Sequence, residues 1–169
     1  MSLKNRWALV TGASSGLGAD FARQLAARGV NLILVARRQE ALEKLATELR
    51  PSGIQVQVVP CDLSSSQARQ NLLAQVEQVD ILVNNAGLGV YGAFADADWD
   101  KLSQMLEVDV AALTHLTHLF LPQMRSRSWG RILQVASTAS FQPCPSYAAY
   151  AATKAYVLNF SLALNYELR

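Results

Sequence analysis

The sequence predicts an α/β fold with a doubly wound parallel sheet, and three observations support this prediction. Short apolar runs alternate with longer amphipathic segments, which is typical of successive βαβ units. Apolar residues make up 51% of the chain and charged residues 17%, so we expect strands that are covered on both faces. The length of 169 residues suits one domain with a substantial core, and we treat residues 1–169 as a single domain.

Five strands and five helices are expected in alternation. The strands are predicted at Trp7–Thr11, Asn31–Ala36, Ile54–Val59, Val79–Val83 and Arg131–Ala136, and the helices at residues 16–28, 38–50, 65–77, 98–127 and 147–168. The second and fourth strands are almost continuously apolar, which indicates inner positions, whereas the third alternates as a partly covered edge strand does. Right-handed crossovers and the doubly wound connection then place the strands in the order 3-2-1-4-5.

Charge and hydropathy exclude several classes of protein. The net charge is only +2 and the basic residues are scattered, so no nucleic-acid or anionic membrane surface is predicted. No apolar run reaches the length of a signal-peptide core or a membrane span, and we expect a cytoplasmic location. Cys61 and Cys144 lack metal-site spacing and fit reduced thiols. His115 and His118 have no further ligand nearby, so we expect packing or an oligomer contact and no metal site.

The segment TGASSGLG joins the first predicted strand to the first predicted helix. Its glycines, Gly12, Gly16 and Gly18, allow the backbone to approach a phosphate closely, while the N–H groups and dipole of the following helix face the charge. Ser14 and Ser15 add hydroxyl donors. An ordinary glycine-rich turn is the alternative, but three glycines in this position favour a pyrophosphate, and a dinucleotide is the natural ligand.

The second strand ends in VARR, where the ribose of a bound adenosine is expected. An acidic residue there would accept a hydrogen bond from the 2′-hydroxyl of NAD, whereas an arginine accommodates the 2′-phosphate of NADP. Ala36 and Arg37 therefore favour NADP over NAD, although two arginines can also simply begin a solvated helix. Asp62, after the third strand, could accept a hydrogen bond from an adenine amino group, and Asn84–Gly87 would line the same cleft; a plain turn is the alternative for each motif alone.

The last predicted helix carries Tyr150 and Lys154 four residues apart, so the two side chains lie on one face. A lysine ammonium near a phenol favours the phenolate, which would allow Tyr150 to act as a general acid or base. A packed ring beside a solvated amine is the alternative interpretation. Ser137 lies upstream at the predicted end of the fifth strand, where its hydroxyl could hold a substrate oxygen.

In combination, these motifs resemble the short-chain dehydrogenase/reductase family over almost the whole chain. TGASSGLG is similar to the family's cofactor loop, CDL and NNAG are similar to its next two markers, and Ser137, Tyr150 and Lys154 are similar to its catalytic set. Five motifs occur in the family's order and at its separations. The resemblance implies a Rossmann-like sheet and a single NAD(P)-binding domain.

The resemblance also implies roles for individual residues. Tyr150 would exchange a proton with the carbonyl or alcohol, Ser137 would position the same oxygen, and Lys154 would stabilise the phenolate and hold the nicotinamide ribose. Hydride would pass between the nicotinamide and the substrate carbon. The residues that the resemblance places against the cofactor are Gly12, Ser14, Gly16, Leu17, Gly18, Arg37, Asp62, Leu63 and Asn85.

Neighbouring residues compete for two of these roles. Tyr147 is a second phenol on the same segment, but an alanine and not a lysine follows it four residues later, so Tyr150 is preferred. Thr138 and Ser140 are further hydroxyls beside Ser137, and the family's spacing to Tyr150 favours Ser137.

The sequence departs from the family at Asp109, where the family usually has an asparagine that shapes this helix and orders a water chain to the lysine. An ionised aspartate only accepts hydrogen bonds, whereas an amide also donates. We therefore expect either a weakened or rewired proton relay, or a carboxylate that stabilises the Lys154 charge.

A second departure is length, because family members continue past the Tyr–Lys helix with two more strands and a substrate loop. This chain stops at Arg169, which would leave the fifth strand as an uncovered edge. We therefore expect an incomplete or truncated sequence that lacks the family's last two strands and much of the substrate pocket.

Two functions follow from these observations. The first is an NADP-dependent oxidoreductase acting on a small-molecule carbonyl or secondary alcohol, as Ser137, Tyr150 and Lys154 suggest. The second is a cofactor-binding or regulatory remnant without turnover, as Asp109 and the missing strands suggest. The apolar faces of the helices at 98–127 and 147–168 favour a homo-oligomer, since these helices form the dimer contact in the family; the alternative is that they cover their own sheet.

Overall fold

A computed structural model describes residues 2–168 and confirms the predicted α/β fold. Its sheet is parallel, with the strand order β3-β2-β1-β4-β5 that the sequence predicts. The strands are β1 (Trp7–Thr11), β2 (Asn31–Ala36), β3 (Val56–Pro60), β4 (Ile81–Asn84) and β5 (Arg131–Gln134). The helices are α1 (Gly16–Ala26), α2 (Gln39–Leu49), α3 (Ser66–Gln75), α4 (Trp99–Leu106), α5 (Leu113–Ser126) and α6 (Ala148–Glu167).

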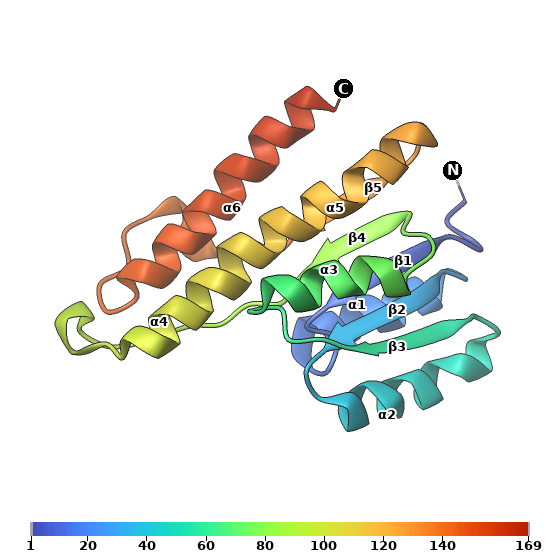
Figure 1. Ribbon diagram of the computed structural model, residues 1–169, viewed down its shortest axis with the longest axis horizontal. Helices are drawn as coiled ribbons and strands as arrows, with labels where there is room; N and C mark the ends of the chain where they lie inside the picture. The colour runs from blue at the N-terminus through green and yellow to red at the C-terminus, as the bar shows by residue number, and fades with distance from the viewer. Residues whose placement is uncertain (1, 169) are drawn as a thin grey trace.

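Helices lie on both faces of the sheet (Figure 1), and an apolar layer packs between the sheet and the helices on each face. Alternate residues of β1 point to opposite faces: Val10 packs in the layer that contains α1 and α2, and Leu9 packs in the layer that contains α3 and α5. Both side chains have no exposed surface. This two-sided burial explains why the inner strands read as continuous apolar runs.

The predicted strand boundaries hold for β1 and β2 and shift for the other three. β3 begins two residues later than predicted and ends one residue later. Its first pair with β2 joins Val56 to Leu32, and its last pair joins Pro60 to Ala36. A proline is tolerated there because β3 is an edge strand, with a single strand neighbour. β4 begins at Ile81, since the Val79 N–H donates to a side chain of α5. β5 ends at Gln134, two residues before its predicted end.

The helix predicted over residues 98–127 is divided, and this is the largest correction to the predicted elements. The first part, α4, passes into a π-helical segment, η3 (Glu107–Ala112), and then into α5. Asp109 lies within η3 with its carboxylate buried, and it accepts a hydrogen bond from the backbone of the β4–α4 loop. The wider turn is a common feature of functional sites in helices.

β5 forms the second edge of the sheet and is the less covered one. Arg131 and Leu133 are exposed, and Leu133 has 42% of its surface accessible. Within residues 2–168, no helix is both long and apolar enough to cross a membrane.

Candidate functional site

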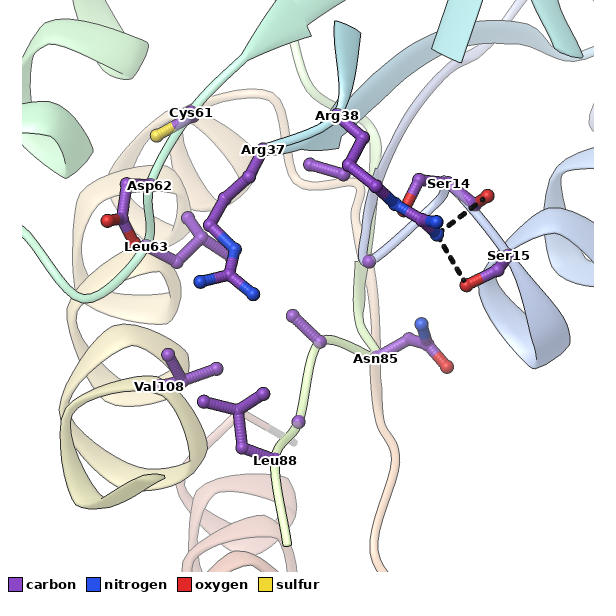
Figure 2. Close-up of a pocket in the computed structure, with 14 residues that line it drawn as sticks. Ser14, Ser15, Arg37, Arg38, Cys61, Asp62, Leu63, Asn85, Leu88 and Val108 are labelled. Atoms are coloured by element: carbon purple, nitrogen blue, oxygen red, sulfur yellow. Dashed lines mark hydrogen bonds between the residues drawn. The ribbon is translucent and has the colours of Figure 1, made fainter. Parts of the chain in front are cut away.

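The carboxyl ends of β1 to β4 surround a cavity of about 380 Å³ (Figure 2). Ligands of doubly wound sheets bind at this edge, at the point where the strand order reverses. Here that point lies between β1 and β4. The residues that line the cavity are Gly12, Ser14, Ser15, Ala36, Arg37, Arg38, Cys61, Asp62, Leu63, Asn85, Ala86, Gly87, Leu88 and Val108.

Glycines are required in the loop between β1 and α1 because the end of β4 packs directly against it. Gly12 has a φ of +66°, and a Cβ atom there would lie 2.8 Å from the Asn85 amide nitrogen. A Cβ atom on Gly18 would collide with the Gly12 carbonyl oxygen. Asn85 donates from this amide to the Thr11 carbonyl at 2.9 Å, so the amide holds the loop against β4.

Thr11 ties the ends of the two central strands together. Its buried hydroxyl donates to the Val83 carbonyl at 3.2 Å and accepts from the backbone N–H groups of Asn85 and Ala86 at 2.9 and 3.0 Å. A β-branched residue with one hydroxyl therefore completes the hydrogen bonding where β4 ends.

Two arginines enter the first cavity from the end of β2. Figure 2 shows the Arg37 guanidinium in the cavity and the Arg38 guanidinium over the glycine-rich loop. Arg38 donates to the hydroxyls of Ser14 and Ser15, each at 3.2 Å. Of the two, Arg37 alone was predicted as a cofactor residue; the second arginine of VARR is the signal that indicates Arg38.

Asp62 lies beside Arg37 after β3. Its Oδ1 accepts hydrogen bonds from the backbone and hydroxyl of Ser64, at 3.0 and 2.8 Å. These two bonds, with the nearby charge of Arg37, hold the pKa of the Asp62 carboxyl below its usual value. Asp62 is therefore an ionised acceptor at the cavity.

A second cavity of about 570 Å³ adjoins the first and shares Asn85, Gly87 and Leu88 with it. It carries the predicted phenol and lysine of α6 in an otherwise mostly apolar lining. Its other lining residues are Leu17, Gly89, Val135, Ala136, Ala139, Cys144, Tyr147, Tyr150 and Lys154.

Lys154 is buried between α6, β5 and η3, with 5% of its surface exposed. Its Nζ donates to the Val135 carbonyl at 3.2 Å, lies 3.6 Å from Asp109 Oδ2, and is 5.7 Å from the centre of the Tyr150 ring. The helical spacing therefore brings the phenol and ammonium together as predicted. A Cβ atom on Gly87 would lie 3.2 Å from Nζ, so a small residue is needed opposite the lysine.

Asp109 lies behind Lys154 and has 1% of its surface exposed. Its Oδ1 accepts from the Leu88 N–H at 2.7 Å, and its Oδ2 accepts from the Thr153 hydroxyl at 3.4 Å. Burial raises the pKa of the Asp109 carboxyl, and the Leu88 hydrogen bond and the Lys154 charge offset only part of this rise. Of the two arrangements expected from the sequence, the structure has the one in which the carboxylate and ammonium are close.

Ser137 occupies a different position from the strand end expected from the sequence. β5 ends at Gln134, and Ser137 caps the 3-10 turn η4 (Thr138–Phe141). Its Oγ accepts from the Ala139 N–H at 3.2 Å, which leaves the hydroxyl proton able to donate. Ser137 is not among the lining residues of the second cavity in the part of the chain that the structure describes.

The competing hydroxyls have other partners. Ser140 donates from its hydroxyl to the Lys154 carbonyl at 2.8 Å and so connects η4 to α6. Tyr147 lines the second cavity, and its ring centre lies 5.8 Å from that of Tyr150. The Tyr91 ring packs beside Tyr147 of this pair, with its ring centre 4.9 Å from that of Tyr147. The loop that carries Tyr91 has no local motif, so the place of this ring beside Tyr147 was not predicted.

The histidines and cysteines do not form a metal site. No group of three potential metal ligands occurs between residues 2 and 168. His115 accepts a hydrogen bond at Nδ1 from Arg69, and Cys61 and Cys144 are both free thiols that line the cavities. Burial raises the pKa of the Cys61 thiol.

The chain is similar in sequence and structure to known dehydrogenases. The sequence model of the family described as short chain dehydrogenase matches residues 6–169. Inactive hydroxysteroid dehydrogenase-like protein 1 of Homo sapiens is 35% identical over 168 residues, which cover 96% of this chain and 51% of that protein. The chain spans about half the length of the curated relatives it matches, between 51% and 59%.

Two solved structures share the fold over nearly the whole chain. A short-chain dehydrogenase from Sphingobium yanoikuyae in complex with NADPH has a TM-score of 0.92 and 35% identity, covering 96% of this chain and 66% of that one. The bulky-bulky ketone specific alcohol dehydrogenase from Comamonas testosteroni has a TM-score of 0.92 and 34% identity, covering 96% and 67%.

Proposed function

Since the chain belongs to the short-chain dehydrogenase family, we propose that it is an NADP-dependent oxidoreductase acting on a carbonyl or secondary alcohol. The observation that supports this most directly is the junction of the two cavities at Asn85, Gly87 and Leu88. A dinucleotide lying across that junction would have its adenosine half beside Arg37 and its nicotinamide half beside Tyr150.

The first cavity suits a phosphorylated adenosine. The loop of Gly12 to Gly18 offers close backbone approach at the start of α1, where the helix dipole favours a pyrophosphate. Arg37 and Arg38 supply positive charge for a 2′-phosphate, and the cavity has no acidic residue at the end of β2. The relative from Sphingobium yanoikuyae was solved with NADPH, which supports the same choice.

In the second cavity the protein's own task is proton transfer and orientation. In the reducing direction, the Tyr150 hydroxyl donates its proton to the substrate oxygen, and in the oxidising direction the phenolate removes it. Lys154 stabilises the phenolate, and Ser137, which in the sequence lies between the lining residues Ala136 and Ala139, would donate its hydroxyl proton to the same oxygen. A nicotinamide bound there would supply or accept the hydride at the substrate carbon.

The second candidate is a chain that binds the cofactor without turnover. One observation favours it: Asp109 neutralises Lys154 at 3.6 Å, which weakens the electrostatic support that the ammonium gives to a phenolate. A human relative carries the name Inactive hydroxysteroid dehydrogenase-like protein 1, which supports this alternative. This alternative predicts NADPH binding without reduction of any carbonyl.

The first experiment is titration of the full chain with NADPH and NADH, followed by nicotinamide fluorescence and thermal melting. We expect saturable binding of NADPH, weaker binding of NADH, and stabilisation of about 2.7 kcal/mol at a hundred-fold excess over Kd. Absence of NADPH binding would contradict both candidate functions.

Tyr150→Phe then separates the two candidates. The variant keeps the ring and removes the proton donor, so we expect a loss of turnover of about a hundredfold or more with NADPH binding retained. Tyr147→Phe is the matched control, because it removes a hydroxyl from the same cavity three residues away. A wild-type chain that binds NADPH but reduces no ketone or aldehyde would support the cofactor-binding alternative.

We also propose that the chain forms a homo-oligomer through α4, α5 and α6 and acts in the cytoplasm as one NAD(P)-binding domain. Exposed apolar side chains on α6 support the first point, since Leu162 has 53% and Tyr166 has 68% of its surface accessible. Sedimentation equilibrium of Leu162→Glu against wild type tests it. A monomer in both would contradict it.

A further inference from the structure

We infer that Arg69 is a positioning residue that holds together the two walls at the adenine end of the first cavity. This inference depends on the proposed function, because it names the group that the cavity would receive. Arg69 does not line the cavity; it lies behind it, on α3. No sequence motif marks this residue.

Arg69 is a buried cation with hydrogen bonds to three separate segments. Only 4% of its surface is exposed. Its Nη1 donates to the Leu63 carbonyl at 2.6 Å and to Glu107 Oε2 at 3.2 Å, and its Nε donates to His115 Nδ1 at 3.2 Å. One side chain therefore connects the loop after β3 to the π-helical segment and to α5.

Two partners of Arg69 belong to segments that line the first cavity. Leu63 lines the cavity itself, and Val108 follows Glu107 in η3 and lines the same cavity. Figure 2 shows the Leu63 and Val108 side chains at one end of the cavity, near Asp62 and Arg37. An apolar pair beside an ionised carboxylate suits a flat purine whose amino group donates to Asp62.

The chemistry of this position requires an arginine. A buried guanidinium is stable only when its N–H groups are bonded and its charge is compensated, and here Glu107 provides the compensating charge. His115 accepts only while its Nδ1 is unprotonated, and burial together with the charge of Arg69 lowers the pKa of this imidazole. A lysine carries its three N–H donors on a single nitrogen and not on a planar fork, so it cannot hold all three partners at these angles.

Loss of the Arg69 side chain would release the walls from each other. Leu63 would lose the donor to its carbonyl, and Glu107 would be free to turn outward because its side chain is 46% exposed. The segments at 61–65 and 107–112 would then fluctuate independently. The cavity would have to be ordered by the ligand, and this ordering would weaken binding.

The test uses 2′,5′-ADP, which carries the adenine and the 2′-phosphate but no nicotinamide. Calorimetric titration of the full chain is compared with Arg69→Met and Arg69→Lys, below the melting temperature of every variant. We expect about tenfold weaker binding in both variants, the equivalent of one lost hydrogen bond to a charged group. Leu45→Ala is the control, because it destabilises the opposite apolar layer and should leave the affinity unchanged.

Amide hydrogen exchange of the free chain is the second measurement. Arg69→Met should accelerate exchange at 61–65 and 107–112 more than Leu45→Ala does at equal loss of global stability. Equal affinity for 2′,5′-ADP in wild type and Arg69→Met would overturn the inference while leaving the cofactor site intact. Failure of the wild type to bind 2′,5′-ADP would overturn the proposed cofactor site, and unchanged exchange in the variant would overturn the connection by Arg69 independently of any ligand.

Discussion

Asp109 shows how burial alters the chemistry of a single residue. An aspartate in water is ionised at neutral pH at little cost, but this carboxylate has almost no contact with solvent and is balanced by one ammonium and two donors. Burial raises the pKa of the Asp109 carboxyl, so the protonated form is favoured more in the folded than in the unfolded chain. Asp109 therefore contributes most to stability at low pH.

This gives a pH-dependent prediction for Asp109→Asn. Stability contributed by a raised carboxyl pKa is present below 3.8 and is lost as the pH rises through the folded value. The free energy of unfolding of the variant, relative to wild type, should therefore increase with pH above that point, by at most about 1.4 kcal/mol per pH unit. Asparagine retains the acceptor for the Leu88 N–H.

Urea unfolding of wild type and Asp109→Asn at a series of pH values measures this difference. Asp62→Asn is a suitable control, because the pKa of the Asp62 carboxyl is lowered and its removal should give the opposite slope. Parallel pH profiles for Asp109→Asn and wild type would contradict the prediction.

At the scale of elements, the start of α1 is determined by its close approach to Gly12 and Asn85, which follow β1 and β4. Gly16 and Gly18 are both part of α1, yet a Cβ atom on Gly16 would meet nothing within 4 Å, whereas one on Gly18 would collide with the Gly12 carbonyl. Gly16 is needed for its φ of +53°, and Gly18 is needed for space. The two glycines look alike in the sequence and serve different purposes.

The contrast predicts different costs for two alanine substitutions. Gly16→Ala should lower the free energy of unfolding by about 1 kcal/mol, the cost of a positive φ in a residue with a side chain. Gly18→Ala should cost about 2 kcal/mol or more, although alanine favours helices, because α1 must move away from the Gly12 carbonyl and the Asn85 side chain. Chemical denaturation of both variants measures the costs, and a stabilised Gly18→Ala variant would refute the argument from crowding.

At the scale of the whole molecule, the sheet connects two apolar layers that share its strands. Phe120 of α5 is fully buried in one layer, and Leu42 of α2 is fully buried in the other. Because β1 contributes side chains to both, neither layer can separate without exposing the other. We therefore expect residues 2–168 to unfold in one transition.

Phe120→Ala tests this expectation. The substitution should lower the free energy of unfolding by about 3–5 kcal/mol, because it leaves a cavity between α5 and the sheet. Amide exchange should accelerate by the same factor in α2, in the opposite layer, as in α5. Acceleration confined to α5 and α3 would show that the layers unfold separately and would contradict the single domain.

Much of the fold and part of the site follow from local patterns. The strand order, the glycine-rich turn and the juxtaposition of Tyr150 with Lys154 were predictable, because apolar periodicity and a four-residue helical spacing are written in contiguous sequence. The boundaries of β3, β4 and β5 were not, since they depend on pairing between distant residues.

The sequence by itself determined the order of the elements and the family, and it predicted several residues that line the first cavity, among them Arg37, Asp62 and Asn85. Only the tertiary structure decided the π-helical segment, the pairing of Asp109 with Lys154, the place of Arg38 over the loop and the reach of Arg69. Apart from the helical segment, each of these is a contact between side chains and partners from different elements. A local pattern specifies which face a side chain occupies, whereas its partner depends on which elements the completed sheet brings beside it.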